Sequence, residues 1–544
     1  LQASGQSENS IRVEWTPISY TADGGNYEIS YATAQAGPYT VAGVTTNKIS
    51  KNYLVKNLNS DTTYFLRVRT YTPAHAPQQN ALYSDYSAPV SSRTLAPGAP
   101  PPITTQSDIT IKALEVTQGI QNLANAMPLV QDRVTWVRAY VQSIGGNING
   151  VQARLHGFRD NVELPDSPLL AENNPITVRT DGGQRTNLND SFQFFIPKTW
   201  RSGAVTFRVE VNFDGAISES SLENDAFSAT VTFYPSKELN LVMLPMKLYD
   251  QGDQSKGVLI SNADNPKLPP IINLAMRYLP ISRINWTASN VTLSPNCGTE
   301  ATPRACNFED AADWSKALKA VETTRQAQEH VQLWFQSNTQ NHWVGLVPES
   351  LTTNGTAGLG AMPLKKNWRQ LTAYNLLAQL GDNRLFGWPW YIQGSATLAH
   401  ELGHNFGLKH INCIGTEANP TQLFPTSYPN CSLEVVDPNG FYGFDVYYDI
   451  AGLAEPTVIS NDPNASAPNL AFPMMGYKFP DWVPSFKYCE LLIKFGIPCS
   501  LYDYSAYDNN TQVQAAHAQV EPPRPLAAPL ARKSARMLPA ATSF

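Results

Sequence analysis

Residues 400–410 read His400-Glu401-Leu402-Gly403-His404-Asn405-Phe406-Gly407-Leu408-Lys409-His410, which fits H-E-x-x-H-x-x-G-x-x-H at every fixed position. Residues four apart in a helix lie one turn above each other, so His400 and His404 can bind one ion with Glu401 beside them. Gly407 is suited to the left-handed conformation that turns the chain back and brings His410 in as a third ligand. Three protein ligands leave a fourth position open, so the motif predicts a catalytic zinc site with Glu401 as general base.

The main alternative is an ordinary amphipathic helix that carries H-E-x-x-H by accident. The chain has only 8 His in 544 residues. Random placement would give the short motif in roughly one such chain in two hundred, and the added Gly and third His lower this to roughly a few per million. A second alternative is a site that binds metal without catalysis. The extended motif favours hydrolytic chemistry over both.

This motif resembles that of the metzincins, a clan of zinc endopeptidases that carry a methionine turn beneath the metal. A candidate turn is Pro473-Met474-Met475-Gly476-Tyr477, in which Pro473 and Gly476 favour a reversal of the chain. The resemblance implies that Met475 is the methionine-turn residue and that the Tyr477 hydroxyl stabilises a developing oxyanion. The alternatives are a methionine pair that only fills the core and a tyrosine that is a packed ring with a solvated tip.

Length, composition and charge indicate which class of protein carries this site. The 544 residues predict three or four domains, and 15% charged residues with 41 Pro and 24 Tyr are typical of secreted β-rich modules. A net charge of −6 argues against a nucleic-acid partner. No apolar run approaches the roughly 20 residues that span a bilayer. Because the chain starts at Leu1 within an apparent strand, we expect a processed piece of a longer precursor.

Six cysteines stand in three couples that are local in the sequence. We predict disulfides within each couple, which are Cys297 with Cys306, Cys413 with Cys431, and Cys489 with Cys499. Such bonds form in an oxidising compartment, so a secreted or cell-surface location is expected. The alternative is six buried free thiols.

Residues 1–95 alternate apolar and polar residues in short runs, a pattern typical of an antiparallel sandwich. They resemble a fibronectin type III domain, with Trp15 as its core tryptophan, residues 27–31 as its next strand and Tyr64 in the tyrosine-corner segment. Residues 96–102 (APGAPPP) predict a stiff, extended linker.

Residues 103–236 predict a second, immunoglobulin-like β-sandwich. Residues 134–141 and 204–211 are its clear alternating runs. The closing stretch, residues 221–225 followed by residues 229–233, loosely resembles bacterial adhesion-related immunoglobulin-like domains. Neither sandwich indicates a function, because such modules serve as spacers, docking surfaces or substrate arms.

Residues 237–502 predict an α/β metzincin-like protease domain, and residues 503–544 a disordered tail. The domain should open with a strand at 239–245. Helices are expected at 311–328, at 368–380 and from near Ser395, and a further strand at 330–335. His330 and His342 are interpreted as strand or loop residues, because the motif histidines already complete a ligand set. Residues 355–363 are either a glycine-rich loop or the edge strand that binds extended peptide.

The fold class is therefore multidomain, with two all-β sandwiches before an α/β zinc protease domain. We expect a secreted endopeptidase with one catalytic Zn²⁺, acting on extracellular proteins or glycoproteins. The alternative is an adhesin or glycoprotein-binding protein with a vestigial protease domain, against which the intact Glu401 argues. Structural Ca²⁺, cleavage preference and oligomeric state stay open.

Overall fold

The structure is a computed structural model of the whole chain. It describes residues 1–21, 23–76, 79–99, 107–256, 258–260, 266, 268–333, 341–348, 351, 353, 356–361, 375–379, 390–411, 433–434, 437–449, 453, 455–462, 464–466, 469–476 and 481–502.

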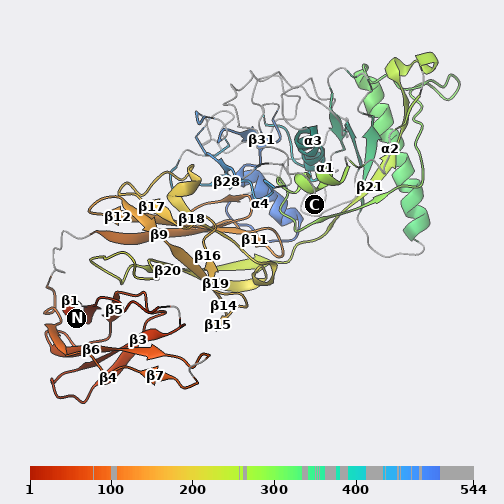
Figure 1. Cartoon of the computed structure of the whole chain (residues 1–544). Helices are drawn as coiled ribbons and strands as arrows, with labels where there is room; N and C mark the ends of the chain where they lie inside the picture. Colours follow the sequence, from red (N-terminus) through yellow and green to blue (C-terminus); the bar gives the residue numbers. More distant parts are fainter. Residues whose placement is uncertain are drawn as a thin grey trace, which may run out of the picture. The chain divides into compact units, whose positions relative to one another are not determined.

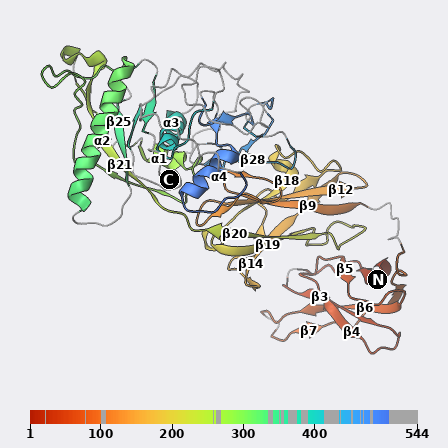
Figure 2. The same cartoon turned by 180° about the vertical axis from the view of Figure 1, so that it is seen from behind.

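The chain divides into two compact units, which Figures 1 and 2 show from opposite sides. The first comprises residues 1–116, 136–200 and 204–231, and the second comprises residues 117–135, 201–203 and 232–544. The inclusion of 117–135 in the second unit was not expected from the sequence; residues 120–121 pair with residues 442–443 there, and buried Arg133 adds further bonds. Its guanidinium donates to the carbonyl oxygens of Gln118 (3.0 Å), Ile281 (2.8 Å) and Met276 (2.7 Å).

The N-terminal part of the first unit is a sandwich of two antiparallel sheets, as predicted. One sheet has the order β1 (Gln2–Ser7), β2 (Ser10–Glu14), β5 (Asn52–Val55). The other has the order β4 (Thr40–Val44), β3 (Asn26–Ala32), β6 (Thr63–Thr72), β7 (Leu82–Tyr83), and β8 (Val90–Arg93) also pairs with β6. The Trp15 ring packs 5.0 Å from that of Tyr27, and the buried Tyr64 hydroxyl accepts a bond from the Asn59 N–H at 2.9 Å. That bond is the tyrosine corner of the fibronectin type III fold.

A second set of strands follows. One sheet has the order β18 (Ser191–Phe195), β12 (Trp136–Ile144), β9 (Asp108–Thr117). Another contains β20 (Ala226–Tyr234), β19 (Gly203–Val211), β14 (Ala153–Arg159) and β15 (Val162–Glu163) in that order, with β16 (Leu169–Leu170) on β14. A third pairs β13 (Ile148–Val151) with β17 (Ile176–Val178). The pairing of β12 with β18, of β14 with β19 and of β13 with β17 is antiparallel. Along β19, Val205, Phe207 and Val209 are buried in alternation, which is why the sequence shows a period of two.

The second unit is built on a five-stranded sheet with the order β24 (Ile284–Ala288), β21 (Leu239–Pro245), β25 (Asn341–Val347), β27 (Asn375–Gln379), β26 (Gly358–Gly360). The first four strands are parallel, and β26 runs antiparallel to β27 at the edge of the sheet. The predicted strand at 239–245 is confirmed as β21. Of the two interpretations of residues 355–363, the described part is an edge strand.

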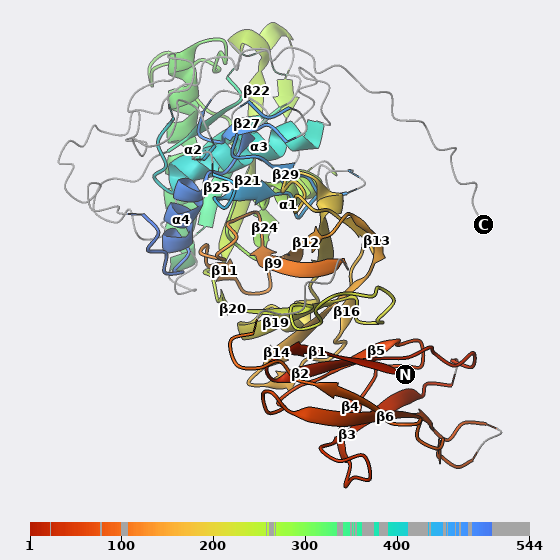
Figure 3. The same ribbon diagram turned by 90° about the vertical axis from the view of Figure 1, so that its left-hand side faces the viewer.

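Helices cover both faces of this sheet. Helix α2 (Ala311–Leu333) packs on β25 and β27, whereas α3 (Trp390–Asn405) packs on β26 and β27 and against α1 (Leu268–Ala275) (Figure 3). Trp343 on β25 bonds to Glu329 of α2, and its neighbour His342 bonds to Asn405 of α3. Successive strand residues point to opposite faces, so α2 and α3 lie on opposite sides of the sheet.

Three predicted elements differ in the structure. Residues 330–333 end α2 and do not begin a strand, because Arg325 bonds to Glu322 and Glu329, at positions i−3 and i+4, and supports the helix there. Residues 375–379 form strand β27 and not a helix, since a short apolar run between two covered faces has no distinguishing period. Helix α3 begins at Trp390, so Ser395 is an interior residue and not its N-cap.

Short elements complete the second unit. They are β10 (Ile120–Gln121), β11 (Leu129–Val130), β22 (Lys247–Tyr249), β23 (Val258–Ile260), β28 (Tyr442–Phe444), β29 (Val458–Ile459), β30 (Phe472–Pro473), β31 (Asp481–Trp482) and α4 (Ser485–Lys494). Strands β10, β28 and β29 form a small sheet. Within the described ranges, no helix is long and apolar enough to cross a membrane.

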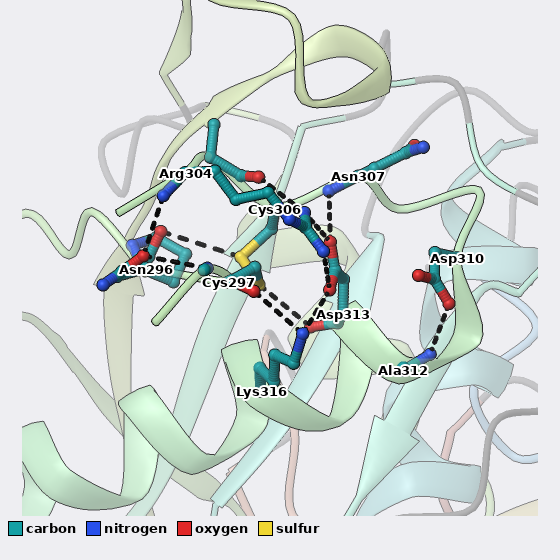
Figure 4. The surroundings of a disulfide bond; sticks show 12 residues. Asn296, Cys297, Arg304, Cys306, Asn307, Asp310, Ala312, Asp313 and Lys316 are labelled. Atoms are coloured by element: carbon teal, nitrogen blue, oxygen red, sulfur yellow. Dashed lines mark hydrogen bonds and ion pairs between the residues drawn. A yellow bond between two sulfur atoms is a disulfide. The ribbon is translucent and has the colours of Figure 1, made fainter. Parts of the chain in front are cut away.

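Disulfides join Cys297 to Cys306 and Cys489 to Cys499, whereas Cys413 and Cys431 lie outside the described residues. Figure 4 shows the surroundings of the first bond. Buried Asp313 accepts bonds from Arg304 (2.9 Å) and the Asn307 N–H (2.8 Å) there. Lys316 donates to the Cys297 carbonyl oxygen at 2.8 Å, so the loop is fastened to the first turns of α2.

Candidate metal centre

The end of helix α3 places the first two motif histidines and turns the chain towards the third. Gly407 has φ +87°, in the left-handed region. The Gly407 N–H donates to His404 O at 2.8 Å, and the Leu408 N–H donates to Gly403 O at 2.8 Å. These two bonds form a Schellman motif, which ends the helix at Asn405.

The three motif histidines converge in the structure. His410 Nε2 lies 3.3 Å from His400 Nε2 and 3.0 Å from His404 Nε2. All three side chains are buried, and they are the one cluster with metal-ligand geometry among the residues that the structure describes. Ligands about 2.05 Å from a tetrahedral zinc ion lie about 3.3 Å apart, so the spacing fits this metal.

The opposite ring nitrogens fix the tautomers of two histidines. His400 Nδ1 lies 2.7 Å from Met474 O, and His404 Nδ1 lies 3.0 Å from Leu408 O. A carbonyl oxygen only accepts hydrogen bonds, so each Nδ1 carries the proton and each Nε2 presents a lone pair. Lone pairs that point at one another across about 3 Å repel unless a cation lies between them. The donor set is therefore arranged for a metal ion, with its outer hydrogen bonds already made.

The predicted methionine turn lies under the zinc helix. A Cβ atom added to Gly403 would lie 2.7 Å from Met475 Sδ, so the buried Met475 side chain packs directly against the backbone at Gly403. The Ile411 N–H donates to Met475 O at 2.9 Å. Residues 474 and 475 thus bond both to His400 and to the residue after His410. Tyr477 lies outside the described residues.

Glu401 lies on α3 with its side chain against strand β26. A Cβ atom on Gly358 would come 2.6 Å from Glu401 Cγ, and one on Gly360 would come 2.5 Å from Glu401 O and 2.9 Å from His404 Cβ. Only a strand without side chains on this face can approach the helix so closely. The structure thus packs Glu401, which follows His400 in the chain, directly against the edge strand.

His342 is not a ligand. Its Nδ1 lies 3.1 Å from Asn405 Oδ1, and its ring packs edge-on against Phe406 at 5.3 Å. Burial lowers the pKa of His342 to about 4, with the charge of Arg325 acting in the same direction and the bond to Asn405 opposing, so its side chain is neutral at pH 7. The side chain of His330 is outside the described set.

Several residues at the site were not singled out in the sequence, namely Met474 through its carbonyl oxygen, Gly403, Asn405, Gly358 and Gly360. Two signals were present. A glycine inside a helix, such as Gly403, is often a close-packing position. The spacing of Gly358 and Gly360 puts both on one face of a strand.

A three-layer α/β domain with three convergent imidazoles, two of them on a helix that also carries a glutamate, defines a zinc metalloprotease. Family models place it more narrowly: residues 272–442, which include all three histidines, match metallo-peptidase family M12, and residues 1–81 match the fibronectin type III domain. The chain thus carries an N-terminal fibronectin type III domain and an M12 metallopeptidase domain, as the metzincin resemblance predicted.

Solved structures similar to this chain include a segment of two fibronectin type III domains from chicken tenascin. It is 12% identical, with 42% of this chain and 96% of that chain covered and a TM-score of 0.14. A fibronectin type III domain derived from the human KIAA0970 protein is 17% identical, with 19% and 77% covered and a TM-score of 0.14. The FN1–FN3 domains of chicken CNTN1 are 10% identical, with 42% and 65% covered and a TM-score of 0.15. The search of curated proteins found no match.

Proposed function

We propose that this zinc metalloprotease is a secreted endopeptidase that cleaves extracellular proteins or glycoproteins, with Glu401 as its general base. The observation that carries the proposal is the convergence of three imidazole Nε2 atoms at 3.0–3.3 Å at the end of the helix that also carries Glu401. His400, His404 and His410 would hold the ion. When bound, zinc supplies a Lewis acid that polarises a carbonyl group and favours the deprotonation of water.

Glu401 then performs the proton transfers. Its carboxylate takes the proton of the attacking water, and the resulting acid gives that proton to the nitrogen of the departing amine. The new C–O bond forms first and moves the carbonyl electron pair onto oxygen; when that oxyanion collapses, C=O is re-formed and the C–N bond breaks, so atoms and charges balance without a further reactant. Met475 supports the site from below, and Tyr477 is proposed as a donor to the developing oxyanion.

Strand β26 is the proposed binding edge for the substrate. It is the last strand in the sheet order and runs antiparallel to β27, so an extended peptide can add to it through main-chain hydrogen bonds. Such pairing recognises the backbone of a protein chain over several residues. This supports an endopeptidase over an enzyme for small amides.

Secretion is supported by the two described disulfides, which persist in oxidising compartments, and by the fibronectin type III domain. The boundaries 1–95, 96–102, 103–236, 237–502 and 503–544 remain our proposed domain limits. The sandwiches are proposed as arms that lie outside the chemistry.

The test is zinc content together with cleavage of a panel of extracellular proteins and mucins, for the parent and for Glu401→Gln. Glu401→Gln should bind about one zinc per chain yet lose turnover by at least about 100-fold, because a general base contributes about 10²–10⁴-fold. The matched control is Glu455→Gln, an exposed glutamate of the same unit, which should cleave like the parent. A Glu401→Gln protein with near-parent turnover would overturn the role of Glu401. Zinc binding without any cleavage by the parent would favour a binding protein.

A further inference from the structure

Strand β26 contacts a different helix with each face. Leu359 is buried in the apolar cluster on the α2 side of the sheet, with Trp314, Leu318 and Val321. Gly358 and Gly360, one residue to either side, face α3 and lie against Glu401. The glycines permit this close approach, but a bare backbone provides no side chain that could hold it. Pairing with β27 holds β26 in the sheet, and a side chain of α3 adds a bond directly to the end of the strand.

Asn405, the last residue of α3, provides this bond. Its Nδ2 donates to the carbonyl oxygen of Ala361, directly after β26, at 2.9 Å. The side chain is buried, and it follows His404 in the chain. One hydrogen bond thus joins the end of the zinc helix to the end of the edge strand.

His342 fixes the orientation of this amide. The Ala361 carbonyl can only accept, so Asn405 presents its NH₂ group there and turns Oδ1 to His342. The neutral imidazole therefore donates from Nδ1, at 3.1 Å. His342 lies on β25, in the middle of the sheet, and its ring is fully buried against Phe406. The amide is consequently held from a rigid strand.

We infer that Asn405 and His342 are positioning residues for peptide hydrolysis, which hold edge strand β26 against the zinc helix and so set where a paired substrate lies relative to Glu401. This inference rests on the proposed binding of substrate along β26. Neither residue touches the reacting atoms. Their effect should appear in the affinity for long peptides, and much less in the chemical step.

A purely structural role makes a different prediction. A buried Asn–His pair that only satisfies its own polar groups would, when broken, lower the stability of the domain and the fraction of active enzyme. The Michaelis constant of the remaining enzyme would stay at the parent value. Separate measurement of kcat and KM therefore distinguishes the two roles.

The experiment uses the full chain and two substrates, one peptide long enough to pair with β26 and one that spans little more than the cleaved bond. Asn405→Asp keeps the size and the acceptor but removes the donor to Ala361. It should keep zinc, raise KM for the long peptide about tenfold, as expected for one lost buried hydrogen bond, and leave KM for the short substrate unchanged. The matched control is Asn341→Asp. Asn341 precedes His342 on β25, and its side chain points to the α2 face of the sheet.

A second pair of variants keeps the test decisive if Asn405→Asp fails to fold or to bind zinc. His342→Leu removes the donor to Asn405 and should raise KM for the long peptide several-fold, whereas His342→Asn, which keeps a donor near the Nδ1 position, should restore it. A binding measurement is also informative: Glu401→Gln with Asn405→Asp or His342→Leu should bind the long peptide less tightly than Glu401→Gln alone.

Parent values of KM and of peptide affinity in the folded, zinc-loaded variants would overturn the inference. They would leave the proposed function standing, because that function depends on parent cleavage and on its loss in Glu401→Gln.

Discussion

The fibronectin type III domain and the metal centre use buried polar groups for different purposes. In the sandwich, the Tyr64 hydroxyl is bonded to a backbone N–H five residues away, and the buried Lys48 ammonium to Asp23 and Thr72. At the metal centre, His400, Met474 and His410 come from separate segments, and their bonds set the directions of ring nitrogens. Buried polar groups therefore stabilise the fold of the fibronectin type III domain, whereas at the metal centre they orient the ring nitrogens that would bind the metal. Substitutions in the fibronectin type III domain should therefore lower its free energy of unfolding without changing activity, and substitutions at the metal centre should lower activity without changing the stability of that domain.

The largest expected effect is the loss of the metal. His404→Ala removes one of three ligands, so zinc content and cleavage should both fall to background, a loss of several orders of magnitude in kcat/KM. The unfolding transition of the fibronectin domain should not move. Elemental analysis and a peptide assay measure the first effect, and calorimetry the second. His75→Ala, which changes a histidine of the fibronectin domain, is the control and should keep zinc and activity.

Breaking a buried ion pair of the fibronectin type III domain should lower stability and leave activity unchanged, which is the reverse of the result expected for His404→Ala. Asp23→Asn leaves the Lys48 ammonium buried without its counter-charge, which should cost about 3–5 kcal/mol in the free energy of unfolding. Activity per folded molecule should be unchanged. Denaturant titration and active-site counting test this, and a drop in kcat with intact zinc would show that the two regions are coupled.

The contribution of the Asp23–Lys48 pair to stability should also be visible as a loss of stability at low pH. Burial would raise the pKa of Asp23, but hydrogen bonds from Lys48, Gly25 and Thr72 and the charge of Lys48 lower it to about 2. A depressed folded-state pKa gives stability that is present above the unfolded value of 3.8 and is lost as pH falls towards 2. Asp23→Asn should lack this part of the acid sensitivity.

The Cys297–Cys306 disulfide should have a smaller effect, confined to the second unit. Replacing both cysteines by serine opens a loop whose ends are 9 residues apart. Chain-entropy arguments give roughly 3 kcal/mol for a loop of this size. The bond fastens a loop beside α2, on the face away from α3, so zinc and kcat should be kept. A variant that folds but loses zinc would show that this loop supports the metal centre.

The smallest effect concerns carboxyl groups of the second sandwich. Burial and, to a lesser degree, the neighbouring charge of Asp108 raise the pKa of Glu219 above 4.5, and burial together with Glu219 raises that of Asp225 above 3.8. A raised folded-state pKa gives stability that is complete below the unfolded value and is lost as pH rises. Between pH 5 and 8 the Glu219 shift by itself should remove on the order of 2 kcal/mol of stability from the first unit. Glu219→Gln should flatten this dependence, which is the reverse of the Asp23 behaviour.

The sequence determined the parts of this protein that depend on local spacing. Helix geometry alone places His400, Glu401 and His404 on neighbouring positions of one helix. A residue that tolerates positive φ must then end the helix and turn the chain, so that His410 reaches the other two histidines. The alternation of apolar residues gave the sandwiches, because the strand period of two appears directly in the sequence. Short loops likewise predicted the disulfides at 297–306 and 489–499.

Only the tertiary structure decided what depends on contacts between distant segments. Residues 375–379 are a strand because β25 and β26 flank them, which their own periodicity does not reveal. Residues 117–135 belong to the second unit because Arg133 donates to the carbonyl oxygens of Met276 and Ile281 and because β10 pairs with β28. The fastening of β26 to α3 joins His342, Ala361 and Asn405 through side-chain geometry, and no spacing in one sequence encodes that distance.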